Sequence, residues 1–91
     1  MKALFTLGQV CATPGAIELL DQLGLPFNNL LIRHATGDWG DLCLSDKKAN
    51  QDALTSGARI FSSYKLNDHG KIWIITEADR SVTTLLLPEE Y

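Results

Sequence analysis

The segment 71–77 constrains the fold more than any other part of the chain, because it is apolar on both sides. It reads Lys-Ile-Trp-Ile-Ile-Thr-Glu and is rich in β-branched and aromatic residues, which favour a β-strand. Side chains alternate between the two faces of a strand, so Ile72 and Ile74 share one face. Trp73 and Ile75 share the other. The segment therefore predicts a central strand that needs a cover on each face.

Two further strands are predicted on either side of this segment in the sequence. Residues 59–66 precede it and residues 81–87 follow it, and Pro88 ends the last strand. The connections at 67–70 and 78–80 are short and polar, which is typical of turns. Consecutive strands joined by such short turns predict an antiparallel meander.

The N-terminal half of the chain predicts one strand followed by helices. Residues 2–10 alternate loosely in polarity and predict a strand closed by Gly8. Thr13 then supplies an N-cap hydroxyl, and the proline after it lacks the N–H that the first helical position leaves unused. These signals predict a first helix over Pro14–Leu23.

A second and a third helix are predicted between residues 26 and 57. Pro26 begins the second helix and Gly37 ends it, and four residues at helical spacing share its inner face. Those residues are Phe27, Leu30, Leu31 and His34. Ser45 is expected to cap the third helix, which spans residues 46–56 and has only a weak apolar face. Between these two helices, Trp39 is expected to anchor a glycine-rich loop.

The chain of 91 residues is long enough for one domain, so we expect a single α+β domain over residues 1–91. The predicted order is an N-terminal strand, three short helices and a three-stranded antiparallel meander. The whole gives a sheet of three to four strands packed on helices. The path of the N-terminal strand stays open. Because the helices cover only one face, Trp73 and Ile75 need a cover from the N-terminal strand and loop or from another subunit, and we predict a homodimer across this face.

Charge and cysteine content narrow the class of protein. Eight basic and eleven acidic residues give a net charge of −3 without a basic stripe, which disfavours nucleic-acid binding. The N-terminus has no signal-peptide pattern, and no apolar run approaches the roughly 20 residues that cross a membrane. Cys11 and Cys43 could form one disulfide, but we expect both to be buried and reduced. The sequence therefore predicts a cytoplasmic protein without a membrane partner.

The sequence gives no sign of a metal or cofactor site. His34 and His69 are far apart, and neither a metal-binding histidine motif nor a paired CxxC motif is present. The glycines match neither a phosphate-binding loop nor a dinucleotide fingerprint. We therefore expect no metal and no cofactor.

One set of residues could support metal-independent RNA cleavage. His34 would act as general base, with Arg33, Tyr64 and Arg80 contacting the phosphate or stabilising the transition state. A band of hydroxyls across the sheet would line such a site, formed by Ser62, Ser63, Tyr64, Thr76, Thr83 and Thr84. The competing interpretation, which we favour, is that His34 is a half-buried structural residue and the hydroxyls are ordinary cross-strand pairs.

Four segments of the sequence together resemble a known protein family. They read VCATPGA at residues 10–16, RHATGDWG at 33–40, IWIITEADRS at 72–81 and LLPEEY at 86–91. The chain is similar over nearly its whole length to small "plasmid-related" proteins carried on bacterial plasmids and integron gene cassettes. The resemblance implies a bacterial, cytoplasmic accessory protein, and it implies no catalytic residue.

The leading hypothesis is a non-enzymatic interaction module, a homodimer that contacts an unidentified host or mobile-element protein. Its contact residues would be Trp39, Trp73 and Ile75. The small ribonuclease is the first alternative. A small-ligand pocket near Trp39 and Trp73 is the second.

Overall fold

The computed structural model describes residues 2–66, 68 and 70–91, and it shows the predicted α+β fold. Residues 67 and 69 of the predicted turn at 67–70 lie outside the described residues. The strands are β1 (Gln9–Ala12), β2 (Ile60–Lys65), β3 (Lys71–Thr76) and β4 (Val82–Leu86). The helices are α1 (Pro14–Leu23), α2 (Phe27–Ala35), α3 (Leu44–Ser56) and the 3-10 turn η1 (Pro88–Glu90).

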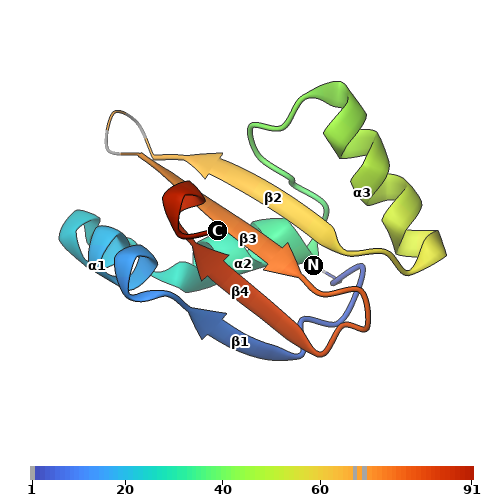
Figure 1. The fold of residues 1–91 in the computed structure, drawn as a ribbon, viewed down its shortest axis with the longest axis horizontal. Helices are drawn as coiled ribbons and strands as arrows, with labels where there is room; N and C mark the ends of the chain where they lie inside the picture. Colours follow the sequence, from blue (N-terminus) through green and yellow to red (C-terminus); the bar gives the residue numbers. More distant parts are fainter. Residues whose placement is uncertain (1, 67, 69) are drawn as a thin grey trace.

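The four strands form one mixed sheet in the order β1-β4-β3-β2 (Figure 1). The predicted antiparallel meander of β2, β3 and β4 is confirmed. Strand β1, whose path the sequence left open, runs parallel to β4 and pairs Val10 with Thr83. The segment that is apolar on both sides thus becomes β3, with a neighbouring strand on each edge.

Helices α1 and α2 cover one face of the sheet, and the turn η1 lies over the other (Figure 1). Their apolar residues meet the inward side chains of β2, β3 and β4 in the main core. This core comprises Ala16, Leu20, Leu30, Tyr64, Leu66, Ile72, Ile74 and Leu85. None of the helices in the described part of the chain is long and apolar enough to cross a membrane.

Local signals fixed the first helix as predicted. The Thr13 hydroxyl accepts a hydrogen bond from the Ala16 N–H at 3.2 Å, and Gly24 ends the helix in the left-handed conformation. The third helix begins earlier than predicted, at Leu44, and the prediction of a Ser45 cap is wrong. Cys43 occupies the N-cap position because its carbonyl already accepts the Lys47 N–H, so Ser45 lies inside the helix.

The predicted N-terminal strand is present as β1, but its predicted bounds of 2–10 are wrong, since β1 begins only after Gly8. Gly8 has a φ of +66°, and a Cβ there would lie 2.3 Å from the Ser81 carbonyl oxygen. The chain therefore turns at Gly8 before it can pair with β4. The residues before it pack elsewhere: the Leu4 N–H bonds to the Ala35 carbonyl, and the Phe5 ring stacks on Trp39.

The cysteine prediction is half right. Among the described residues both cysteines are unpaired, but both are exposed, so the expected burial is wrong. Cys11 lies on β1, in register with Thr84 on the face of the sheet that the helices do not cover. Cys43 lies just before α3, outside both core clusters.

The outer edge of β2 is covered by the chain itself. The Asn50 side chain accepts the Phe61 N–H and donates to the Phe61 carbonyl, at 3.0 and 2.6 Å. Two residues further along, Ser63 bonds through its N–H to the Trp39 carbonyl and through its carbonyl to the Asp41 N–H. Both main-chain groups of two successive outward residues are therefore occupied, which blocks the addition of another strand.

Gly40 makes this cover possible, and its substitution provides a test. A Cβ at Gly40 would lie 2.1 Å from the Ser63 carbonyl oxygen, whereas one at Gly57 would meet nothing within 4 Å. Both glycines have positive φ, +77° and +81°, so the strain from a side chain is similar at each. We expect Gly57→Ala to cost about 1 kcal/mol and Gly40→Ala to cost more than about 2 kcal/mol of unfolding free energy.

Denaturant unfolding of both variants measures this difference. Equal losses of stability in the two variants would contradict the close approach of the loop to β2.

Candidate functional site

His34 lies in the interior and not in an open site. Its ring on α2 has no exposed surface, and both nitrogens are within hydrogen-bond distance of hydroxyls on the sheet. Nδ1 lies 2.5 Å from the Ser62 Oγ on β2, and Nε2 lies 2.9 Å from the Thr76 Oγ1 on β3. The histidine therefore joins one helix to two strands.

The hydrogen bonds beyond Thr76 determine which nitrogen carries the proton. The Thr83 hydroxyl donates to the Leu7 carbonyl at 2.7 Å, so in its contact with Thr76, also 2.7 Å, Thr83 can only accept. Thr76 thus gives its hydrogen to Thr83 and must accept from His34. The neutral ring consequently carries its hydrogen on Nε2 and accepts the Ser62 hydroxyl at Nδ1. We call this series, from Ser62 to the Leu7 carbonyl, the hydroxyl–histidine chain.

The surroundings of His34 keep its ring neutral. The Phe5 ring meets it edge-on at a centroid distance of 5.2 Å, and the Trp39 ring lies at 6.1 Å. Burial lowers the pKa of His34 from 6.5 to about 4. A general base must reach its substrate, and a ring with no exposed surface and two occupied nitrogens does not.

Arg33 is held at the surface by two partners. Its Nε donates to the Asp38 carboxylate at 2.7 Å, and its guanidinium lies 4.5 Å from the centre of the Tyr64 ring. The bond to Asp38 raises the pKa of Arg33, and the reciprocal bond lowers the pKa of Asp38. The Tyr64 hydroxyl donates to the Asp38 carbonyl, and burial raises the pKa of Tyr64 to about 12. These three residues fix the loop after α2 against β2.

Arg80 binds main-chain carbonyls near the end of α3 and in the turn between β3 and β4. Its Nη1 donates to the carbonyls of Ala58, Glu77 and Ala78, and its Nη2 donates to the Ala53 carbonyl near the end of α3. The Phe5 ring lies 5.7 Å below the guanidinium. This guanidinium thus satisfies carbonyls at the end of α3 and in the turn between β3 and β4.

The four residues of the ribonuclease hypothesis therefore do not meet in one open cleft. Tyr64 and His34 are interior, and the guanidiniums of Arg33 and Arg80 are bonded to different groups. The predicted hydroxyl band is divided as well. Ser62, Thr76 and Thr83 are buried beneath the helices, while Thr84 lies on the opposite face of the sheet.

The uncovered face of the sheet carries a groove walled by aromatic rings. Its volume is about 210 Å³, and we call it the aromatic groove. Phe61 on β2 and Trp73 on β3 meet edge-on at a centroid distance of 4.9 Å. The groove is lined by Arg59, Phe61, Trp73, Ile75 and Tyr91. Two of these, Trp73 and Ile75, are the residues that the sequence predicted on the second apolar face of this strand.

The chain covers part of this face with its own C-terminal residues. The Tyr91 ring packs on Trp73 at 5.9 Å, and the Tyr91 hydroxyl accepts a hydrogen bond from Arg59 at 2.7 Å. Ile75 is only 6% exposed, and Trp73 is half-buried. The uncovered apolar area is therefore narrower than the sequence predicted. Trp39, the third expected contact residue, is buried in the core cluster on the helix side, whereas Trp73 lines the aromatic groove on the other side.

Glu90 holds the turn η1 in place over the sheet. Its carboxylate accepts hydrogen bonds from the Thr13 hydroxyl, from the Gly15 N–H at 3.1 Å and from the Leu87 N–H at 2.9 Å. These bonds, led by that from Thr13, lower the pKa of Glu90. Hydrogen bonds thus join the start of α1 to η1, and this contact positions Tyr91 beside Trp73.

Cations lie at both ends of the aromatic groove. Arg59 lines it at one end, and toward the other end Lys65 and Lys71 are cross-strand partners, two residue pairs beyond the Ser63–Trp73 pair. Both lysines are exposed. The sheet alternation places these lysines on the same face as Trp73. The face that carries the aromatic groove thus presents Arg59, Lys65 and Lys71, and Glu89 and Glu90 of η1 lie over the same face.

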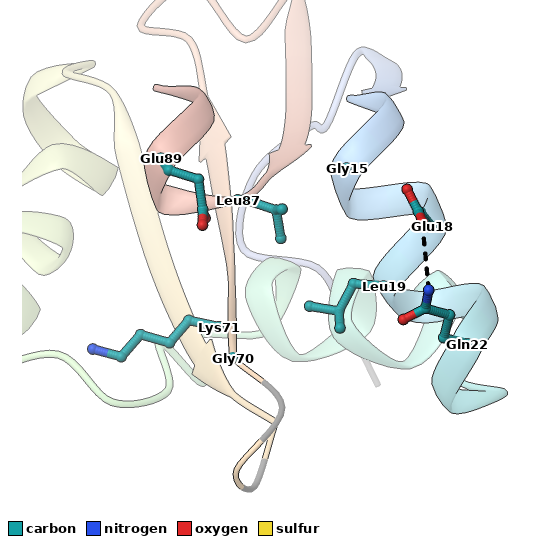
Figure 2. A pocket seen from close by; sticks show the side chains of 8 residues that line it. All are labelled: Gly15, Glu18, Leu19, Gln22, Gly70, Lys71, Leu87 and Glu89. Atoms are coloured by element: carbon teal, nitrogen blue, oxygen red, sulfur yellow. Dashed lines mark hydrogen bonds between the residues drawn. The ribbon is translucent and has the colours of Figure 1, made fainter.

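A second hollow, of about 250 Å³, lies between α1, the start of β3 and η1. In Figure 2, Leu19 projects into it from α1 and Leu87 from the residue between β4 and η1, and the Gln22 amide donates a hydrogen bond to Glu18 along α1. Lys71 points away from the leucines. The polar groups do not converge on a common point, so this hollow lacks the features of a specific site.

Within residues 2–66, 68 and 70–91, no group of three or more potential ligands is placed to hold a metal ion. Comparison with protein-family models, with curated proteins and with solved structures finds no match. The aromatic groove is therefore defined by its own geometry and chemistry.

The burial of His34 predicts a specific pH dependence of stability. The unfolded chain binds a proton on this ring near pH 6.5, whereas the folded protein binds it only near pH 4. The contribution is complete above pH 6.5 and is lost as the pH falls toward 4, by about 3 kcal/mol. Urea unfolding across this range measures the loss. His69→Gln should retain it, and a stability that is flat from pH 7 to 5 would contradict a buried neutral His34.

Removing the Glu90 carboxylate should loosen the cover over Trp73. In Glu90→Gln the charged acceptor for Thr13 and Gly15 is lost, so Tyr91 should leave Trp73 more often. We expect a red shift of Trp73 emission and stronger quenching by iodide, while buried Trp39 contributes a constant background. Glu89→Gln is the matched control and should leave both readings unchanged. Identical spectra for the two variants would contradict the role of Glu90 in holding η1 and Tyr91 over the sheet.

Proposed function

We propose that the protein is a non-enzymatic interaction module whose contact surface is the aromatic groove. The occupant is a segment of another protein that inserts an apolar side chain beside an acidic one. The observation that carries this proposal is the combination of three aromatic rings with Arg59 around one open hollow. Aromatic and arginine residues are the types that most often dominate binding at protein interfaces.

The groove suits one inserted side chain better than a broad flat contact. Ile75 forms a buried floor, and Phe61 and Trp73 form walls that are already held in an edge-on arrangement. Such preformed walls lose little conformational freedom on binding. An apolar side chain of the partner would displace water from these walls, which supports affinity without any new folding.

The charges around the groove favour an acidic partner. Arg59 at one end and the Lys65–Lys71 pair at the other are exposed and lie on the uncovered face. A carboxylate next to the inserted side chain would meet one of these cations. Such complementarity steers association and selects among partners more than it adds affinity.

The cellular setting belongs to the same proposal. The resemblance of the segments at 10–16, 33–40, 72–81 and 86–91 to plasmid-related proteins supports a bacterial mobile-element accessory protein acting in the cytoplasm. The partner would be a host or mobile-element protein. A homodimer across Trp73 and Ile75 stays a prediction, and the cover provided by Tyr91 leaves less apolar area for it.

The alternative functions gain no support from the geometry. A ribonuclease would need His34 at a surface, and His34 has no exposed surface. A small-ligand pocket shared by Trp39 and Trp73 would need them on one side of the sheet, and they lie on opposite sides. We therefore keep the interaction module as the conclusion.

Selection from a library of random peptides displayed on phage tests the proposal. We expect selected peptides to carry an apolar residue next to Asp or Glu, and to bind more weakly at high salt. Trp73→Ala and Arg59→Glu should each weaken binding by about tenfold. Arg59 is exposed, so its variant probes the groove without disturbing the core.

Leu44→Ala is the matched control, because Leu44 is 84% exposed on α3 and lies outside the groove. It should bind the selected peptides like the unmodified protein. Peptides without the acidic–apolar pattern, or peptides that bind Trp73→Ala and Arg59→Glu at full strength, would contradict the proposal. Binding of a single-stranded RNA oligomer at the groove instead of peptides would contradict it as well.

A further inference from the structure

The two edge strands of the sheet differ in whether their outward main-chain groups are hydrogen-bonded. On β2 the outward main-chain groups of Phe61 and Ser63 are occupied, and the Lys65 N–H bonds to the Asp41 carboxylate at 2.7 Å. Strand β1 forms the opposite edge and is exposed along most of its length. An uncovered edge of this kind is a template for another strand.

The register shows which groups of β1 face outward. The Gln9 N–H bonds to the Ser81 carbonyl and the Thr13 N–H to the Leu85 carbonyl, so alternate residues of this segment point at β4. Val10 and Ala12 lie between them and direct their N–H and C=O groups away from the sheet. No hydrogen bond within the described part of the chain uses these groups. Val10 is 42% exposed.

We propose that β1 is a dimerisation edge, at which a second copy of this chain adds its own β1 in antiparallel orientation. The strand reads Gln-Val-Cys-Ala and carries no charge, so two copies meet without repulsion. Each copy offers the same two donors and two acceptors, which a two-fold axis pairs with each other. This contact does not involve the aromatic groove and is independent of the function proposed for it.

The residues that flank β1 select one register. Gly8 has a φ of +66° and leaves the strand, and Pro14 has no N–H to donate. A two-fold axis at Val10 or at Ala12 would need one of these flanking residues as a partner. An axis at Cys11 pairs Val10 of each copy with Ala12 of the other and forms four main-chain hydrogen bonds.

This register brings the two Cys11 side chains together. Cys11 pairs with itself at a non-hydrogen-bonded position, where the Cα atoms of opposite residues lie about 4.5 Å apart. That separation is within the range of a disulfide. Cys11 is exposed and unpaired, and it lies in register with Thr84 on the face that carries the aromatic groove. The dimer would therefore have one continuous eight-stranded sheet with both grooves on the same side.

Cross-linking and sedimentation of the full chain test the proposal. With oxidised glutathione, two Cys11 thiols and one oxidised glutathione give one Cys11–Cys11 disulfide and two reduced glutathiones. We expect this covalent dimer in the unmodified protein and in Cys43→Ser, and its loss in Cys11→Ser. Cys43 is equally unpaired and exposed, so it controls for cross-links formed by random collision.

Two substitutions at Val10 separate edge pairing from misfolding. Val10→Pro removes one outward N–H that the monomer does not use, and Val10→Lys retains that N–H but places a charge on the edge. Both should shift sedimentation equilibrium to the monomer at concentrations where the unmodified protein is dimeric. Ile32→Lys is the matched control, because Ile32 is 49% exposed on α2, and it should stay dimeric.

Three results would overturn the proposal. The unmodified protein could remain monomeric at about 1 mM, which would limit the association to less than about 4 kcal/mol. The dimer could persist in both Val10 variants. It could instead be lost in Arg59→Glu, which would assign the contact to the uncovered sheet face. In that last case, peptide binding at the aromatic groove is measured separately on Cys11→Ser. The dimer proposal for β1 and the binding proposal for the groove can therefore fail independently.

Discussion

The hydroxyl–histidine chain is the interaction on which the rest of the structure depends. It runs from Ser62 through His34, Thr76 and Thr83 to the Leu7 carbonyl, and so connects β2, α2, β3, β4 and the N-terminal segment. Each polar group in it is buried or partly buried and would be costly without a partner. Because each hydroxyl and ring hydrogen in this series can be donated in only one direction, the hydroxyl–histidine chain also specifies a single arrangement of these elements.

This assignment of His34 to the interior determines where function can lie. His34 and Arg80, two residues of the ribonuclease hypothesis, are occupied in holding helices, turns and strands together. The surface that remains is the sheet face opposite the helices, where packing is incomplete and a cation lies beside aromatic rings. The polar residues that the sequence suggested as catalytic are thus used for folding, and the proposed binding surface is the aromatic groove.

Sequence patterns predicted the structure correctly where the interactions join residues that are close in the sequence. Thr13 with Pro14, the glycine after α1 and the alternation in β3 each act within a few residues, and the structure confirms what they predict. The partners of His34 lie 28 and 42 residues away, and no spacing rule connects them. The path of β1 depends in the same way on the close approach of Gly8 to Ser81, which is visible only once both are placed.

The candidate site was predictable only in part. Alternation identified Trp73 and Ile75 as a second apolar face, but it gave no indication that Tyr91 packs over Trp73 or that Asn50 covers the edge of β2. Both covers come from segments distant in sequence. The same limit explains the error on Cys11, whose exposure follows from the position of β1 at the sheet edge and not from its neighbours in the chain.

The protonation of the His34 ring tests the central claim most directly. A long-range proton–nitrogen NMR spectrum at pH 7 distinguishes the two neutral tautomers from the charged ring. The hydroxyl–histidine chain predicts a neutral ring with its hydrogen on Nε2, slow to exchange with water, and a bare Nδ1. A hydrogen on Nδ1, or a positively charged ring at this pH, would contradict the arrangement and with it the assignment of His34 to a structural role.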